Sequence, residues 1–243
     1  MLASSLLHEY LPLIQKLREQ GSQVILLPEE ILTVNQSNKA QIKSEFSGVA
    51  QQNKITLIVG ITELQNNKRY NSLWVFNPQG ILTGTYYKQH LVPDIEAKVT
   101  PGINLFSFPV NQGKAGVAIC RDMDYTNPAR SYGHANTNIL FVPAWDFEVD
   151  ATVHAFGAIT RGIENGYTIV RTARGGYLSV ISPTGERVAE ILSVGKKSQI
   201  LITNATIWLN SSAYAKYKDW FIYVLILILV FLILKSIRYK KNK

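Results

Sequence analysis

The sequence contains a single cysteine, Cys120, among its 243 residues. One thiol excludes an internal disulfide and any zinc site built mainly from cysteines. Histidine is also scarce, and the spacing of the four that occur does not match a metal-ligand set: His8, His90, His134 and His154. We therefore expect no metal and no other cofactor.

Acidic residues are fewer than basic ones, 17 against 25, which gives a net charge of +8. Five of the basic residues lie at the extreme C-terminus: Lys235, Arg238, Lys240, Lys241 and Lys243. The rest of the chain is only mildly basic and has no basic stripe with interleaved aromatic residues. We therefore expect no nucleic-acid partner.

The basic tail follows a run of residues, 220–234, that contains no charged side chain. A buried core helix is the alternative interpretation, but such helices usually carry a polar stripe and do not end in a cationic tail. The pattern predicts a transmembrane helix whose basic end stays in the cytoplasm, with the preceding body on the other side of the cell membrane. We expect one soluble domain over residues 1–207, a juxtamembrane linker over 208–218, a single membrane span over 219–237 and a basic tail over 238–243.

Helix-like and strand-like patterns alternate along the body, with turn signals between some of the strands. Apolar spacing predicts helices near 6–17, 38–52, 123–135 and 151–165, and strands near 24–27, 55–63, 70–76, 81–87, 115–119, 139–142, 167–172 and 177–182. Because hairpins are interspersed among the helices, we expect a layered α/β sandwich with mixed sheets rather than an all-parallel sheet.

Three reactive side chains each follow a strand-like run: Glu29, Lys88 and Cys120. Ligand sites of α/β proteins gather at the carboxyl ends of strands, so the three could converge. A carboxylate can take the proton of a cysteine, and a lysine can stabilise the oxyanion that forms after thiolate attack. Each residue also has an ordinary interpretation, as a helix N-terminal charge, a surface lysine and a packed thiol, and the residues alone leave both open.

These segments resemble the nitrilase (carbon–nitrogen hydrolase) superfamily. Pro28-Glu29, Tyr87-Lys88 and Ile119-Cys120 occur in the order of its Glu–Lys–Cys elements, and the later segments 161–165, 170–171, 175–176 and 183–185 match its helix–strand–hairpin pattern. The resemblance covers roughly residues 5–205 and implies an α-β-β-α sandwich with Glu29, Lys88 and Cys120 as catalytic residues.

Within the superfamily, the segment 88–93 followed by Glu96 is most similar to bacterial apolipoprotein N-acyltransferase. That resemblance implies a nitrilase-like domain outside the cytoplasmic membrane, followed by a last transmembrane helix. It also implies that Glu96 positions Lys88 or the acceptor amine. Trp145 resembles the tryptophan segment of that family, although a core aromatic is an equally good interpretation, and Arg121 either favours the thiolate electrostatically or points to solvent.

The chain departs from that family in three respects. Asp122 stands two residues after the cysteine where the family usually has glutamate, the N-terminal bundle of membrane helices is absent, and the sequence opens in what should be the first helix, without the first strand. We expect either a fragment or a split gene, or a domain that works with a separately encoded membrane subunit. A missing strand would leave one sheet edge uncovered.

Three functions follow from the resemblance. The first transfers an acyl chain from a phospholipid, through a thioester on Cys120, to the N-terminal amine of a lipoprotein. The second is hydrolysis of a small amide by a membrane-anchored carbon–nitrogen hydrolase. The third is a truncated, non-catalytic remnant or accessory subunit.

Overall fold

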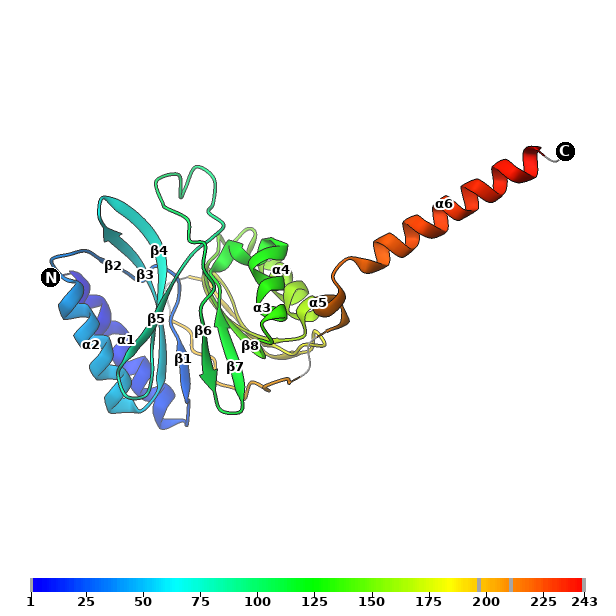
Figure 1. Cartoon of the computed structure of the whole chain (residues 1–243). Coiled ribbons are helices and arrows are strands. Elements are labelled where there is room, and N and C mark those ends of the chain that lie inside the picture. The colour runs from blue at the N-terminus through cyan, green and yellow to red at the C-terminus, as the bar shows by residue number, and fades with distance from the viewer. Residues whose placement is uncertain (1, 196–197, 210–211, 242–243) are drawn as a thin grey trace.

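The computed structural model describes residues 2–195, 198–209 and 212–241. Two stacked β-sheets carry helices on their outer faces, and one long helix projects away from them (Figure 1). The helices are α1 (Leu2–Glu19), α2 (Lys39–Asn53), α3 (Thr126–His134), α4 (Ala151–Asn165), α5 (Ala213–Tyr217) and α6 (Trp220–Lys241), with a 3-10 helix η1 (Cys120–Asp124). The strands are β1 (Val24–Leu26), β2 (Leu32–Val34), β3 (Thr56–Gln65), β4 (Lys68–Phe76), β5 (Leu82–Tyr87), β6 (Ser107–Val110), β7 (Gly113–Val117), β8 (Ile139–Trp145), β9 (Thr168–Arg174), β10 (Gly176–Ile181) and β11 (Arg187–Ser193).

Both sheets mix parallel and antiparallel pairs. Sheet A has the order β1-β3-β4-β5, with β2 also pairing in parallel with β3, and sheet B has the order β11-β10-β9-β8-β7-β6. Strands β7, β8 and β9 run parallel at the centre of sheet B, and β1 runs parallel to β3 in sheet A. The prediction of a sandwich with mixed sheets is confirmed.

Three apolar clusters hold the layers together. Strand β3 shows how they arise: Leu57, Val59 and Ile61 pack toward α1 and α2, whereas Ile58 packs into the cluster between the two sheets. This is the alternation expected of a strand that is buried on both faces. A third cluster joins sheet B to α3 and α4 through buried residues such as Tyr132, and so completes the α-β-β-α order of layers.

The structure adds elements that the sequence pattern did not indicate. The predicted helix over 123–135 is divided into η1 and α3, with extended backbone at Tyr125 between them. Strands β2, β6 and β11 were also missed. Strand β6 contains Pro109 and lies at the edge of sheet B, where a missing N–H is tolerated. Strand β11 has no buried residue and carries Arg187 and Glu190, so it lacks the apolar alternation of a half-buried strand.

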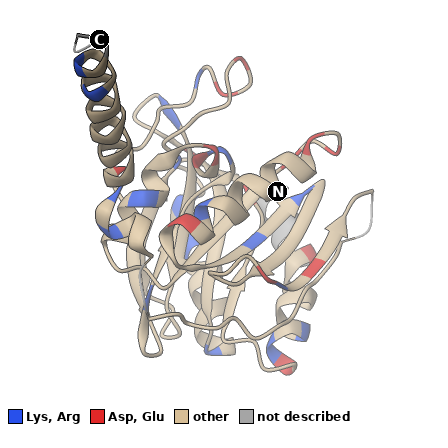
Figure 2. Cartoon of the chain, turned by 90° about the vertical axis from the view of Figure 1, so that its right-hand side faces the viewer, with Lys and Arg blue, Asp and Glu red and all other residues tan. Residues whose placement is uncertain are grey.

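Helix α6 is apolar over most of its length. The window Trp220–Tyr239 has a mean hydropathy of 2.7 and is not buried against the rest of the described chain, so the helix is long and apolar enough to cross a membrane. Its basic residues lie near the C-terminal end (Figure 2). At its base, Arg130 of α3 forms an ion pair with Asp219 at 3.1 Å and stacks on Tyr214 of α5 within the predicted linker.

Candidate active site

Cys120 begins a sharp turn shortly after strand β7, separated from it by the buried residues Ala118 and Ile119. Its φ angle is +43°, in the left-handed region that residues other than glycine seldom adopt, and its side chain is buried. Such a conformation costs about 1–3 kcal/mol and persists only where the surroundings enforce it. The turn ends the strand abruptly and holds the thiol at the carboxyl end of the central parallel strands.

Glu29 reaches the same place from the other sheet. It lies in the connection between β1 and β2, which packs closely over Gly60 of β3: a Cβ atom at Gly60 would lie 2.2 Å from the Pro28 carbonyl oxygen and 2.8 Å from the Glu29 Cα. Only glycine at position 60 therefore lets this connection approach the sheet. The Glu29 carboxylate is buried and accepts a hydrogen bond on Oε1 from Lys88 Nζ at 2.9 Å.

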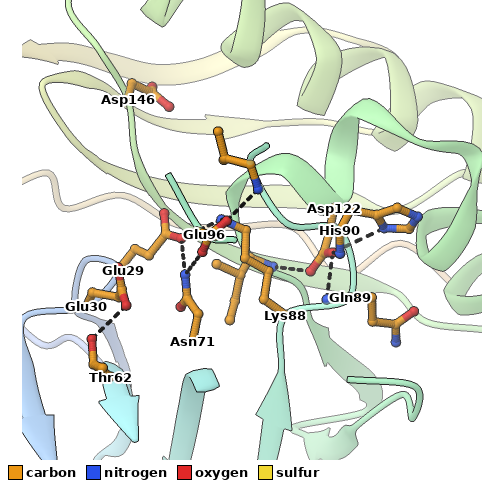
Figure 3. Close-up of polar contacts among 12 residues, drawn as sticks. Glu29, Glu30, Thr62, Asn71, Lys88, Gln89, His90, Glu96, Asp122 and Asp146 are labelled. Atoms are coloured by element: carbon orange, nitrogen blue, oxygen red, sulfur yellow. Dashed lines mark hydrogen bonds and ion pairs between the residues drawn. The ribbon is translucent and has the colours of Figure 1, made fainter. Parts of the chain in front are cut away.

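Lys88 is buried at the end of β5, with only 2 % of its side chain exposed. Its backbone N–H donates to the carbonyl of Asn71, so the end of β5 is fixed against β4. The Lys88 Nζ contacts Oε1 of Glu29 and Oε2 of Glu96, both at 2.9 Å (Figure 3). Two of the three N–H groups of the ammonium are thereby occupied, and one remains.

Asn71 joins the two carboxylates and was not among the residues indicated by the sequence. Its buried Nδ2 donates to Glu29 Oε1 at 2.6 Å and to Glu96 Oε1 at 2.8 Å. Glu96 also accepts the backbone N–H of Val92 at 2.7 Å, so both of its oxygens are in use, whereas Glu29 Oε2 is buried with no partner in the described chain. The only sequence signal for Asn71 is a polar residue within the buried half of β4.

Asp122 ties the cysteine turn to the lysine loop. It is fully buried, and its Oδ2 accepts from the hydroxyl of Tyr86 at 2.7 Å and from the backbone N–H of Ile119 at 2.9 Å. Its Oδ1 accepts the backbone N–H groups of Gln89 at 3.1 Å and His90 at 2.8 Å (Figure 3). The shorter side chain that departs from the family pattern is therefore fully bonded in this fold.

Burial and charge control the protonation of the cluster. Burial, together with the negative charge of Glu29, raises the pKa of the Cys120 thiol, while Lys88 and Arg171 oppose that rise. Burial also raises the pKa of Glu29 despite the nearby Lys88. Burial alone would lower the pKa of Lys88, but Glu29, Cys120 and Glu96 outweigh it and hold that pKa above its ordinary value. The resting site thus contains a neutral thiol, a charged lysine and a carboxylate of increased basicity.

The pKa of Glu96 moves in the opposite direction to that of Glu29. Burial would raise it, but Lys88, Asn71 and the backbone N–H of Val92 together lower it. The two carboxylates around Lys88 are therefore unequal: Glu96 holds its charge, and Glu29 is the better proton acceptor.

A second buried ion pair, also missed from the sequence, lies beside the thiol. Arg171 of β9 donates from one guanidinium nitrogen to both carboxylate oxygens of Asp146, at 2.6 and 2.8 Å. Both residues act electrostatically on Cys120, with Arg171 lowering its pKa and Asp146 raising it. The only sequence signal was an arginine inside an apolar strand, Val170-Arg171. The pairing of that strand with β8, which Asp146 directly follows, comes from the structure.

The two remaining predicted residues lie away from the buried cluster. Arg121 donates to the hydroxyl of Tyr125 at 3.2 Å and packs over its ring, so Lys88 and Arg171 are the main cations acting on the thiol. Trp145 is 47 % exposed and stacks beneath the Arg174 guanidinium at 3.9 Å, which shows that the interpretation as a core aromatic is wrong. No group of three or more His, Cys, Asp or Glu residues in the described ranges is arranged to hold a metal ion.

Comparison with known proteins identifies the family of this chain. The carbon–nitrogen hydrolase family model matches residues 2–211. Human omega-amidase NIT2 is 26 % identical over 210 residues, covering 73 % of this chain and 75 % of that protein. The apolipoprotein N-acyltransferase of Geobacter metallireducens is 24 % identical over 228 residues, covering 82 % of this chain and 43 % of that protein.

Solved structures share the fold. A carbon–nitrogen hydrolase from Helicobacter pylori has a TM-score of 0.72 at 20 % identity, with 80 % of this chain and 82 % of that chain covered. An amidase from Nesterenkonia sp., which carries the acetamide moiety of fluoroacetamide covalently added at its active-site cysteine, also has a TM-score of 0.72, at 18 % identity and with coverage of 78 % and 81 %.

The sandwich and its buried cluster of glutamate, lysine and cysteine define an enzyme of the nitrilase superfamily. This chain belongs to the carbon–nitrogen hydrolase family. It spans about three quarters of the length of the NIT2 amidase and less than half of the length of the N-acyltransferase.

Proposed function

We propose that this protein transfers acyl groups through a thioester on Cys120, with Glu29 as the base and Lys88 as the oxyanion stabiliser. The observation that carries the proposal is the division of hydrogen bonds in the buried cluster. Glu29 has one oxygen held by Lys88 and Asn71 and the other free to accept a proton, and Lys88 has one N–H free to donate.

The proposed first step moves the thiol proton to Glu29 as the Cys120 sulfur attacks the acyl carbonyl. This transfer leaves the net charge of the buried cluster unchanged, which suits a thiol whose pKa is raised. The carbonyl oxygen becomes an oxyanion next to the Lys88 ammonium, and collapse of the intermediate breaks the bond to the leaving group, which takes the proton from Glu29. The product is a thioester on Cys120.

In the second step an acceptor attacks the thioester and Glu29 takes the acceptor's proton, which then returns to the departing sulfur. We propose a phospholipid as the acyl donor and the N-terminal amine of a lipoprotein as the acceptor. Support comes from α6, an exposed apolar helix joined to the enzyme domain, and from the similarity to N-acyltransferases over 82 % of the chain. In this arrangement α6 spans the cell membrane with its basic end in the cytoplasm and the enzyme domain on the other side.

A second candidate, hydrolysis of a small amide, is favoured by the similarity to NIT2 omega-amidase, which covers most of both proteins. The chemistry of the first step is the same, but an amine leaves in place of an alcohol and water attacks the thioester. In both candidates Glu29, Lys88 and Cys120 keep the same roles.

Mass spectrometry of the full chain in detergent distinguishes these candidates. Incubation with a phospholipid that carries an isotope-labelled acyl chain should add that chain to Cys120, and the adduct should be absent from Cys120→Ala and present in a control with a substitution at the exposed Asp94. Turnover of small amides without a lipid adduct would overturn the acyl-transfer proposal in favour of hydrolysis. The absence of both reactions would overturn the acyl-transfer proposal for this chain acting on its own.

A further inference from the structure

Arg174, the last residue of β9, carries a positive charge that no carboxylate of the described chain neutralises. Its guanidinium forms no ion pair with those residues and makes one long hydrogen bond, from Nη1 to the Glu30 carbonyl oxygen at 3.4 Å. A guanidinium has five N–H donors, so most of those of Arg174 have no partner within the described chain. This side chain is therefore a cation with bonding capacity to spare.

The two acidic residues that bond to Arg174 do so through their backbone, because their side chains are held elsewhere. The backbone N–H of Asp146 donates to the Arg174 carbonyl at 2.8 Å, while the Asp146 carboxylate is bonded through both oxygens to Arg171. The Glu30 carboxylate forms an ion pair with Arg69 at 3.2 Å. Neither carboxylate is thus available to the Arg174 guanidinium.

Trp145 holds this guanidinium in one plane. The two residues are register partners in the parallel pairing of β8 and β9, and the Arg174 Cζ lies 3.9 Å from the centre of the Trp145 ring. The half-exposed indole covers one face of the guanidinium and leaves its N–H edge free. Such an edge can bind two oxygens of one phosphate at once, which a lysine in the same place could not do.

Arg174 lies close to the reacting groups without being one of them. Its bond to Glu30 reaches the residue directly after Glu29, the proposed base. Its stacking partner directly precedes Asp146, which acts electrostatically on Cys120. Glu30 and Asp146 lie on the same side of the buried cluster (Figure 3). An anionic group bound at Arg174 would therefore belong to the molecule whose carbonyl is at the thiol.

We propose that Arg174, held flat on Trp145, binds the phosphate of the phospholipid acyl donor and selects donors that carry one, an inference that rests on the acyl-transfer function proposed above. In a glycerophospholipid the phosphate is joined to the ester carbonyl through the short glycerol backbone. A donor whose carbonyl lies at Cys120 thus carries its phosphate only a few bonds away. Arg174 takes no part in the chemical steps, and it determines specificity by placing the donor.

Equilibrium binding tests this subsite without requiring the reaction. The probes are dihexanoyl phosphatidylglycerol and dihexanoylglycerol, which share their ester groups and differ in the phosphate headgroup, titrated by calorimetry into the full chain with Cys120→Ala in a neutral detergent. The phosphate-bearing lipid should bind at least about tenfold more tightly, and Arg174→Gln should remove most of that difference. Arg174→Lys, which keeps the charge but loses the planar fork, should retain part of it. Arg187→Gln is the matched control, because Arg187 also stacks on an exposed ring, that of Phe156, but belongs to β11.

Equal affinity for the two lipids, or equal weakening by Arg174→Gln and Arg187→Gln, would overturn the proposal. Equally tight binding of inorganic phosphate would show a site for a soluble anion and would also overturn it. The comparison of the two lipids needs no change at position 174, so it holds even if Arg174→Gln does not fold.

Thioester formation on the chain that retains Cys120 separates this inference from the proposed function. Arg174→Gln should raise KM for the phospholipid about tenfold with little change in kcat, and should leave the neutral ester unaffected. An unchanged KM would overturn the role given to Arg174. If neither donor forms a thioester, the acyl-transfer function fails, whereas the difference in binding still decides whether Arg174 recognises the phosphate.

Discussion

Replacing Asp122 with asparagine tests whether one buried carboxylate holds the cysteine turn against the lysine loop. Besides a contact of its Oδ1 with His90 Nδ1 at 3.3 Å, the carboxylate accepts four hydrogen bonds at 2.7–3.1 Å, three of them from backbone N–H groups that can only donate. In asparagine an NH2 group replaces one of the two oxygens, so it would have to face either the donors at Oδ2, Tyr86 and Ile119, or those at Oδ1, Gln89 and His90. The lowest-cost orientation directs it toward Tyr86, whose hydroxyl can reverse its role, and leaves the Ile119 N–H without an acceptor.

A buried donor without an acceptor costs about 1–3 kcal/mol, and the remaining bonds lose the strengthening effect of the charge. We therefore expect Asp122→Asn to lower the free energy of unfolding by about 2–4 kcal/mol. Urea unfolding in detergent, followed by near-ultraviolet circular dichroism, gives this difference from the transition midpoint. Asp94→Asn is the matched control because Asp94 is exposed. A free energy of unfolding for Asp122→Asn within about 0.5 kcal/mol of both the unaltered chain and the control would refute the reasoning.

Three further changes test the remainder of the site. Lys88→Met leaves two buried carboxylates without their cation and should lower the free energy of unfolding by about 3–5 kcal/mol, measured by the same urea titration; an unchanged midpoint would contradict this. Glu29→Gln removes a charge that raises the pKa of Cys120, so iodoacetamide should alkylate the thiol faster near pH 8. The same variant should lose any acyl transfer. Slower alkylation would show that the charge of Glu29 does not act on the thiol. Gly60→Ala should destabilise the fold and displace Glu29, since the new Cβ would lie 2.2 Å from a carbonyl oxygen. The control Gly48→Ala in α2 meets nothing within 4 Å and should raise the free energy of unfolding by about 0.5–1 kcal/mol. Similar urea midpoints for the two variants would contradict the role given to Gly60.

The strand pattern was sufficient to predict a layered sandwich with mixed sheets, and it allowed three reactive residues to converge, which the family resemblance turned into an expectation. Glu29, Lys88 and Cys120 each follow a strand, and the structure brings the three into one electrostatically coupled cluster. Hydrophobic periodicity reports which face of a strand is buried, and chain order then limits where the strand ends can lie.

The supporting contacts could not be predicted in the same way, because they depend on pairing between distant strands. Asn71 bridges Glu29 and Glu96 only because the register of β4 and β5 places it there. The ion pair between Arg171 and Asp146 likewise requires knowledge that β8 and β9 are neighbours. Periodicity identifies such residues as polar groups in apolar strands but does not identify their partners.

The protonated state of Cys120 also affects how the protein ages. Peroxide oxidation and disulfide exchange consume thiolate, so a buried thiol with a raised pKa is a poor target for both. The same raised pKa makes the fold sensitive to alkali: the unfolded chain loses this proton above the ordinary thiol pKa of 9.0 while the folded chain keeps it, so stability falls as the pH rises beyond that value. The sole cysteine of the chain is thus held as an unreactive thiol, which protects it from oxidants, and in the proposed reaction it becomes a nucleophile only as its proton moves to Glu29.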